Sequence, residues 1–296
     1  MSELTRRILF GVIAAPVGIL VVFFGGAAFA ALLAIVAALA AWEFFRVARA
    51  SGLTPLEDVG IPVAAVVPLF VHARYLGLYE LSLAGMALVV LAILALTIFL
   101  RGVNGKPLGA AASTVFGVLY TGGMLSFGYA IRYHPYVIEG VRVPLGTIAV
   151  PAGGLLLLLP LLLTWASDIG AYFVGRAFGK RKLMPSVSPG KTVAGAVGGL
   201  AATVLVGWLY ARFILTPSTQ LAFVRGGIII FSLLVSVAAQ VGDLAESLLK
   251  REAGMKDSSH IIPGHGGVLD RFDSLLFVLP VAYVLFNTLL VWAPPR

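Results

Sequence analysis

The chain has 296 residues, of which 60% are hydrophobic and only 11% are charged, and its mean hydropathy is +1.02. An average soluble domain is about 25% charged, so this composition excludes a conventional globular enzyme. It also excludes a disordered chain, because disordered chains are poor in apolar residues. Apolar runs such as 8–24 and 83–100 are long enough to enter a bilayer. We therefore predict an all-α, polytopic integral membrane protein.

The charge balance is basic, with 21 Lys and Arg against 13 Asp and Glu, a net charge of +8 and a pI near 9.9. In a membrane protein such residues belong to cytoplasmic loops and meet anionic headgroups. No stripe of basic and aromatic residues stands outside the apolar segments, as nucleic-acid binding would require. We expect membrane lipids, and no nucleic acid, among the partners. The absence of cysteine excludes disulfides and thiolate metal sites.

A helix crosses the hydrocarbon core, about 30 Å thick, in roughly 20 residues. This length predicts nine spans, near residues 8–25, 27–46, 59–73, 82–100, 109–131, 147–167, 193–214, 226–246 and 274–292. The first run lacks a convincing cleavage site after its apolar stretch, so we predict that it stays as an uncleaved helix. We divide the chain into N-terminal transmembrane helices, residues 1–146, and a catalytic transmembrane region, residues 147–296.

The distribution of charge predicts the orientation. With the N-terminus in the cytoplasm, 15 of the 21 basic residues lie on the cytoplasmic side, so the N-terminus is predicted inside and the C-terminus outside. Six of the 13 acids fall at or beyond the cytoplasmic ends of the sixth, eighth and ninth spans: Asp168, Asp243, Glu246, Asp257, Asp270 and Asp273. We therefore expect the chemistry in the C-terminal half, at the cytoplasmic face.

The first polar group, Trp165-Ala166-Ser167-Asp168, stands at the end of the sixth predicted span. A carboxylate there costs several kcal/mol if it faces lipid. Asp168 is therefore expected to face protein, water or a cation. The alternative is a helix-end charge that pairs with a nearby Arg or Lys.

The second group is a basic loop that ends in the segment 188–192, Ser-Pro-Gly-Lys-Thr. It is not a P-loop, because Pro185 stands where the pattern requires glycine and no strand is expected before it. We expect Ser188 and Thr192 to lie where a helix begins, with Lys191 adding charge. Such a helix N-terminus can hold a phosphate; an N-cap with ordinary cytoplasmic basic residues is the alternative.

The third group lies at the end of the eighth span. In a helix Asp243, Glu246, Ser247 and Lys250 form one polar stripe, because they are spaced i, i+3, i+4 and i+7. Glu246 has an ordinary explanation as the i, i+4 partner of Lys250. Asp243 has no basic neighbour at such spacing, so we expect a partner from elsewhere, such as a metal ion.

The fourth group runs from Lys256 to Ser274. Three glycines around His265 allow main-chain N–H groups to approach a ligand, and Asp270 and Asp273 stand at the start of the last span. The alternatives are a turn-forming role for His265 and a capping role for Asp273. Oxygen ligands beside many basic residues suit Mg²⁺ and substrate phosphates. They point to a Mg²⁺-dependent enzyme that acts on a phosphate-bearing lipid.

The segment 247–273 resembles the signature of phosphatidate cytidylyltransferases, also called CDP-diacylglycerol synthases. The signature reads S-x-x-K-R, four residues, K-D, and then P-x-H-G-G-x-x-D-R-x-D. S-D-x-G-A-Y at 167–172, S-P-x-K-T at 188–192 and G-D-L-x-E-S at 242–247 resemble the same family. One departure is Ala194, where family members often carry Glu or Gln. Residues before Trp165 resemble the family only as hydrophobic spans.

The resemblance implies that CTP and phosphatidate react to CDP-diacylglycerol and pyrophosphate, by in-line nucleotidyl transfer without a covalent enzyme intermediate. It implies that Asp243 and Asp270 hold Mg²⁺, alone or with a second cation, and that Asp273 and Asp168 support them. It further implies a homodimer in the bacterial inner membrane. The predicted catalytic residues are Asp243, Asp270, Lys250, Arg251, Lys256, His265 and Arg271. The predicted substrate-binding residues are Ser188, Lys191, Thr192, Gly266, Gly267 and Asp168, and the predicted metal ligands are Asp243, Asp270 and Asp273.

Two other classes share some of these features. A secondary transporter would use intramembrane acids near span centres and carry an internal repeat, whereas these acids lie at one end of the spans and no repeat is seen between the halves. A neighbouring lipid enzyme, such as a polyprenol or phytol kinase or an archaeal-type CDP-lipid synthase, should lack the complete H-G-G-x-x-D-R-x-D pattern.

Overall fold

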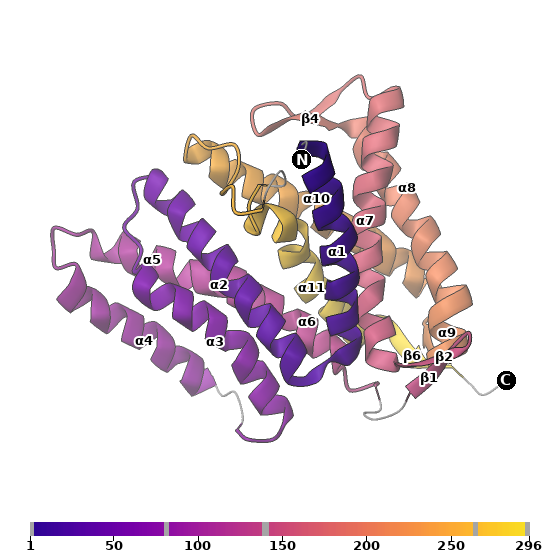
Figure 1. Cartoon of the computed structure of the whole chain (residues 1–296). Coiled ribbons are helices and arrows are strands. Elements are labelled where there is room, and N and C mark those ends of the chain that lie inside the picture. The colour runs from indigo at the N-terminus through magenta and orange to yellow at the C-terminus, as the bar shows by residue number, and fades with distance from the viewer. Residues whose placement is uncertain (1–2, 80–82, 138–141, 263–265, 294–296) are drawn as a thin grey trace. The chain divides into compact units, whose positions relative to one another are not determined.

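The computed structural model describes residues 3–79, 83–137, 142–262 and 266–293, and these are mostly helical (Figure 1). The helices are α1 (Glu3–Phe24), α2 (Gly26–Ala50), α3 (Glu57–Tyr75), α4 (Leu83–Leu100), α5 (Pro107–Val118), α6 (Met124–Arg132), α7 (Ala152–Phe178), α8 (Val193–Tyr210), α9 (Thr216–Thr219), α10 (Gly227–Glu252) and α11 (Leu269–Leu289). The π-helical turns η1 (Leu119–Gly123) and η2 (Ala211–Leu215) join α5 to α6 and α8 to α9. The strands are β1 (Arg142–Leu145), β2 (Ile148–Pro151), β3 (Lys182–Met184), β4 (Ser188–Thr192), β5 (Leu221–Phe223) and β6 (Leu290–Trp292).

Each of the nine predicted spans coincides largely with a helix or with a continuous run of helical elements. Among the described residues, six of these are long and apolar enough to cross a membrane: Gly26–Ala50, Pro107–Arg132, Ala152–Phe178, Val193–Thr219, Gly227–Glu252 and Leu269–Leu289. The apolar helices Ala14–Phe24 and Gly85–Leu100 are shorter. The helical membrane protein is therefore confirmed, whereas the count of nine spans is not.

The strictly all-α prediction is wrong in detail, because three antiparallel two-stranded sheets connect the helices. β1 pairs with β2, so residues 147–151 are not part of a helix. Helix α7 begins only after Pro151, whose ring lacks the N–H that a helix interior requires. Similarly, α11 ends at Leu289 because residues 290–292 pair with β5.

The chain forms two compact units. Unit 1 contains Met1–Tyr129 and Leu248–Phe272, and unit 2 contains Ala130–Ser247 and Asp273–Arg296. This division by contacts is not the sequence division at residue 146. It assigns most of the signature segment to the unit that holds the N-terminal helices.

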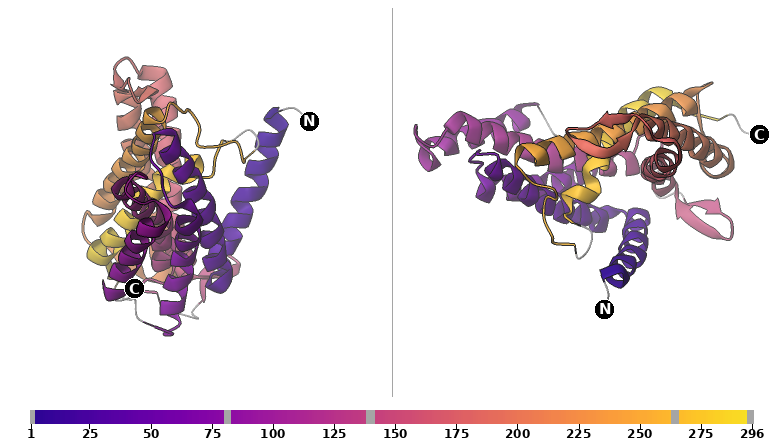
Figure 2. Two further views of the ribbon diagram at one scale, coloured as in Figure 1. Left: turned by 90° about the vertical axis from the view of Figure 1, so that its left-hand side faces the viewer. Right: turned by 90° about the horizontal axis from the view of Figure 1, so that it is seen from above.

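In unit 1, helices α2, α3 and α5 pack together around Phe45, which is completely buried (Figure 1). Gly60 and Gly117 make this possible, because a Cβ atom at either position would lie within 3.0 Å of the Phe45 ring. Helix α1 joins α2 through Gly25 and Gly26, whose φ values of 70° and 54° favour glycine. In both views of Figure 2 the N-terminal end of α1 lies away from the other helices of unit 1.

In unit 2, helix α7 packs closely along α8 (Figure 1). A Cβ atom on Gly170 would lie 2.7 Å from the carbonyl oxygen of Gly198, so small residues let the two backbones approach, as is common between membrane helices. Hydrogen bonds then connect both helices to α10. The Ser167 and Ser236 hydroxyls lie 2.8 Å apart, and Gln240 Nε2 donates to the carbonyl oxygen of Ala196 at 3.2 Å.

Candidate active site

The polar stripe predicted on α10 is present. The Ser247 hydroxyl donates to Asp243 Oδ1 at 3.3 Å, one helical turn away. Glu246, Ser247 and Lys250 are 1%, 9% and 8% exposed, so the stripe faces protein rather than lipid. The remaining positions of α10 are largely apolar, and the helix therefore carries its few polar groups inward.

Asp243 has a partner from elsewhere in the chain, as expected, and that partner is Lys191. In unit 2, Lys191 Nζ lies 2.7 Å from Asp243 Oδ2, and the two side chains are 25% and 35% exposed. Lys191 belongs to β4, which pairs with β3 and thereby fixes the segment 188–192 in an extended conformation. An ion pair this accessible to solvent adds only about 0–1 kcal/mol to stability, so a phosphate or a cation can displace either partner.

Thr192 caps α8, as predicted. Its Oγ1 accepts a hydrogen bond from the Gly195 N–H at 3.1 Å. A Cβ atom on Gly179 would lie 2.6 Å from Thr192 Oγ1, so the glycine after α7 leaves room for this cap. The prediction that Ser188 lies at the helix start is wrong, because Ser188 pairs with Met184 at the beginning of strand β4.

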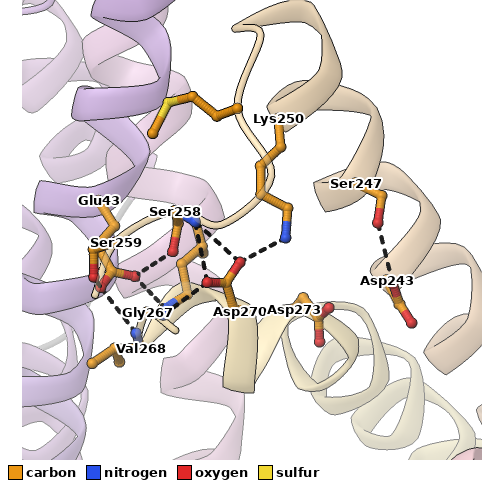
Figure 3. Close-up of polar contacts among 12 residues, drawn as sticks. Glu43, Asp243, Ser247, Lys250, Ser258, Ser259, Gly267, Val268, Asp270 and Asp273 are labelled. Carbon is orange, nitrogen blue, oxygen red and sulfur yellow. Dashed lines mark hydrogen bonds and ion pairs between the residues drawn. The ribbon is translucent and has the colours of Figure 1, made fainter. Parts of the chain in front are cut away.

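Asp273 lies on α11, where it directly adjoins α10. A Cβ atom on Gly242 would lie 2.7 Å from the Asp273 carbonyl oxygen, so the two backbones are in close contact beside Asp243. The Asp273 carboxylate accepts a hydrogen bond from the Ser274 N–H at 2.6 Å. Unit 2 therefore carries the carboxylates Asp243 and Asp273 on adjoining helices (Figure 3).

Asp168 is exposed, but it does not stand at the end of its helix. Helix α7 continues to Phe178 and includes Arg176, which donates to the Tyr172 hydroxyl at 2.9 Å. The hydropathy pattern ended the span at 167 because the following residues are more polar. Hydropathy reports where lipid contact ends, whereas the helix extends beyond that point.

Asp270 connects three parts of unit 1 (Figure 3). Its Oδ1 lies 2.6 Å from Lys250 Nζ, and its Oδ2 accepts hydrogen bonds from the N–H groups of Ser258 at 3.1 Å and Gly267 at 2.8 Å. The side chains of Lys250 and Asp270 are only 11% and 6% exposed. Gly267 therefore gives its N–H group to a carboxylate of the protein. At Gly266, a φ of 79° makes the turn that precedes it.

Glu43, on α2, is a site residue that the sequence reasoning missed. It is completely buried, and Figure 3 shows it facing the signature segment, from which it accepts four hydrogen bonds. One signal was available. A single carboxylate within an otherwise apolar span, 27–46, is by itself a functional candidate.

The other predicted residues occupy the surface or lie outside the described residues. Arg251 donates to the Met255 carbonyl oxygen at 2.8 Å beyond the end of α10, and Lys256 and Arg271 are exposed. His265 lies outside the described residues. The Ile262 N–H donates to the Gly266 carbonyl oxygen at 3.0 Å, which holds the two ends of the segment 263–265 together.

Among the residues that the structure describes, no group of three or more His, Cys, Asp or Glu is placed to hold a metal ion. The donors on the motif segments are carboxylate oxygens, which fit a hard cation such as Mg²⁺ that keeps waters and binds through one or two carboxylates and substrate phosphates. Asp243 fits this use well because its carboxylate is partly exposed. Asp270 is less open to a cation, because its side chain is only 6% exposed and both of its oxygens accept hydrogen bonds from N–H donors of the protein.

These features define a class: a helical protein with several apolar helices of membrane-spanning length, in which two motif carboxylates, Asp243 and Asp270, are each paired with a motif lysine, as suits the handling of phosphates. The chain belongs to the cytidylyltransferase family, whose model matches residues 5–289. This membership favours nucleotidyl transfer over secondary transport.

Individual relatives of the chain carry the name phosphatidate cytidylyltransferase. The chain is 31% identical to the phosphatidate cytidylyltransferase of Bacillus subtilis over 290 residues, which cover 96% of this chain and 98% of the relative. It is 31% identical to that of Synechocystis over 299 residues, 94% and 95% of the two chains. Identity rises to 50% with the Haemophilus influenzae protein of the same name, over 133 residues that span 44% of this chain and 45% of that relative.

Proposed function

We propose that the protein is a phosphatidate cytidylyltransferase, which converts CTP and phosphatidate to CDP-diacylglycerol and pyrophosphate. Relatives of that name match over nearly the whole chain, and the family signature at 247–273 is complete. The observation that supports the proposal most is that each of two motif carboxylates, Asp243 and Asp270, is paired with a motif lysine. The first pair joins two separate motifs, 188–192 and 242–247, and the second joins two parts of the signature segment.

The reaction follows from the substrates. An oxygen of the phosphatidate phosphate attacks the α-phosphorus of CTP in line, and a new P–O bond forms. The bond from the α-phosphorus to the oxygen that bridges to the β-phosphorus breaks, and pyrophosphate leaves with that oxygen. Positioned cations speed such a step by stabilising charge on the phosphates. We assign this role to Lys191, Lys250, Arg251, Lys256 and Arg271.

We assign Asp243, Asp270 and Asp273 as the carboxylates that would hold Mg²⁺, with or without a second cation, and Asp168 as a supporting acid. When bound, the cation draws charge from the triphosphate oxygens. Lys191 and Lys250 neutralise two of these carboxylates, Asp243 and Asp270. Incoming phosphates attract the same lysines, so substrate binding frees the carboxylates.

For the substrates we further assign Ser188, Lys191, Thr192, Gly266 and Gly267 as binding residues and His265 as a catalytic residue, all within the region 147–296. Lys191 carries the strongest support, because its ion pair holds its charge beside Asp243, whereas the Thr192 hydroxyl accepts a hydrogen bond from the Gly195 N–H as the cap of α8.

The decisive experiment follows a labelled phosphate. The purified protein in detergent is given phosphatidate and CTP that is labelled at either the α- or the γ-phosphate. Nucleotidyl transfer carries the α-label into the lipid, whereas a lipid kinase would carry the γ-label. Activity should disappear with a chelator and return with Mg²⁺. Absence of α-label in lipid across several acyl-chain lengths would overturn the proposal.

We also propose nine membrane spans, a cytoplasmic N-terminus, an external C-terminus and a homodimer in the bacterial inner membrane, with the active site at the cytoplasmic face. The charge asymmetry of the loops supports the orientation. Reporter fusions to the two ends should report opposite sides of the membrane. Native mass spectrometry of the detergent-solubilised protein tests the dimer.

A further inference from the structure

The carboxylate of Glu43 is surrounded by donors from the signature loop, a name that we give to residues 256–262 and 266–270. Oε1 accepts from the Ser259 hydroxyl at 2.5 Å and from the Val268 N–H at 2.9 Å. Oε2 accepts from the Ser258 hydroxyl at 2.9 Å and from the Leu269 N–H at 2.6 Å. Each oxygen thus receives one hydroxyl and one main-chain N–H.

This arrangement suits an acceptor with two oxygens. The hydroxyls of Ser258 and Ser259 can reverse their hydrogen bonds, but the N–H groups of Val268 and Leu269 cannot. These two N–H groups stand at the start of α11, which begins at Leu269. The first N–H groups of a helix lack partners within it and favour negative charge. Glu43 therefore caps α11 from a different helix, α2.

The signature loop links Glu43 to Asp270. Ser258 gives its hydroxyl to Glu43 and its main-chain N–H to Asp270 Oδ2 at 3.1 Å. Gly267 gives its N–H to Asp270, and a Cβ atom there would lie 2.0 Å from Ser258 Oγ and 2.5 Å from Glu43 Oε2. The loop is therefore held between two carboxylates. A change at Glu43 is transmitted through Ser258 to Asp270 and its partner Lys250.

We propose that Glu43 is a positioning residue for the transfer reaction: it fixes the signature loop in the conformation that holds Asp270 and Lys250. This inference rests on the proposed function. Glu43 is completely buried. The four hydrogen bonds that its carboxylate accepts in the described part of unit 1 all come from the signature loop. Removal of such an outer partner typically costs about 10- to 100-fold in activity.

The test uses Glu43→Gln in the full-length protein. Glutamine keeps the shape, but its amide nitrogen places a donor against one of the two main-chain N–H groups. Glu57→Gln is the matched control, because Glu57 pairs with Arg49 at the surface, away from the loop. Ser258→Ala and the double variant Glu43→Gln/Ser258→Ala measure coupling. For each variant, kcat, the KM for CTP, the unfolding temperature, and hydrogen exchange of residues 256–272 are compared.

We expect kcat of Glu43→Gln to fall about 10- to 100-fold, with the KM for CTP within about threefold of the wild-type value because Glu43 is completely buried. The double variant should lose no more than Glu43→Gln alone, since both changes break the same connection. Hydrogen exchange should become faster in residues 256–272 and stay unchanged in α8. Glu57→Gln should match the wild type in every measurement.

Three results would overturn the inference. The first is a kcat within about threefold of wild type in folded Glu43→Gln, and the second is additive losses of kcat in the double variant. The third is a loss of kcat that is fully recovered when the assay is cooled below the unfolding temperature of the variant. Should Glu43→Gln fail to fold, Ser258→Ala and Ser259→Ala replace it, because each removes one hydroxyl that donates to Glu43. The same criteria for kcat then apply to these two variants. A wild-type protein that makes no CDP-diacylglycerol refutes the proposed function instead. Unchanged exchange in Glu43→Gln would then overturn the positioning role separately.

Discussion

Lys191 Nζ lies 2.7 Å from Asp243 Oδ2, which joins the basic hairpin to the polar stripe of α10. The corresponding pair in the other unit, Lys250 and Asp270, is at 2.6 Å but far more buried. Lysines therefore neutralise the carboxylates of both Asp243 and Asp270. The difference in burial allows the roles of the two pairs to be separated by substitution.

Asp243→Asn should reduce cytidylyl transfer by at least about 100-fold, comparable to the loss of one transition-state charge contact. Asparagine retains an oxygen for the Ser247 hydroxyl but removes the charge that faces Lys191. The unfolding temperature should change little, because a partly exposed pair is worth about 0–1 kcal/mol. The labelled-CTP assay and a thermal melt in detergent measure both. A folded variant with half of the wild-type activity would refute the role of Asp243.

Lys250→Met should lower the free energy of unfolding by about 3–5 kcal/mol, because it leaves the buried Asp270 carboxylate without its cation. The remaining N–H donors from Ser258 and Gly267 place the loss toward the lower end of this range. Lys191→Met makes the same chemical change at the exposed pair and should cost less than about 1 kcal/mol. Equal losses in denaturant titrations would contradict the difference in burial.

Gly242→Ala should cost about 1–3 kcal/mol of stability and reduce activity, because the added methyl group must push α10 away from α11. It would meet the Asp273 carbonyl oxygen at 2.7 Å and Phe277 Cδ2 at 3.1 Å. Gly18→Ala is the control, since no atom lies within 4 Å of the new methyl group. Thermal melts of the two variants should differ clearly, and a neutral Gly242→Ala would refute the close backbone contact.

His134 should make the protein less stable in mild acid. It lies beyond the end of α6, is 1% exposed and contacts the rings of Tyr136 and Tyr283. Burial lowers the pKa of His134, and the nearby Asn287 side chain opposes this shift only in part. Because the folded pKa lies below that of the unfolded chain, about 6.5, unfolding takes up a proton and stability falls as the pH drops through that value.

The measurement for His134 is the unfolding temperature between pH 7.5 and 5.5 in wild type and in His134→Phe, which keeps an aromatic ring but does not titrate. The wild type should lose stability over this interval more steeply than the variant. Identical slopes in the two proteins would show that His134 is not the group that titrates.

The sequence alone predicted most of the helices, because span length and hydropathy are local properties. It misplaced helix ends where strands pair, at 147–151 and 290–292, since hydropathy does not distinguish a helix from a short hairpin. The helical spacing from Asp243 to Lys250 also predicted the polar stripe correctly. The partner of Asp243 was expected from elsewhere in the chain but could not be identified as Lys191, because their contact depends on tertiary packing.

Glu43 was not predicted for a different reason. Its donors lie as far as 226 residues away in the sequence. The motifs that carry the resemblance begin near Trp165, so they point to the second half of the chain. The buried carboxylate was conspicuous only as a polar residue in an apolar span.

The cap that Glu43 provides for α11 has a consequence for how this protein can be divided. A fragment that starts after residue 146 contains every signature residue, yet it lacks the carboxylate on which four donors of the loop converge. The second half should therefore not keep the signature loop in place when it is expressed alone, although it contains all the motifs. A chimera that takes the signature loop from a relative should take helix α2 from the same parent.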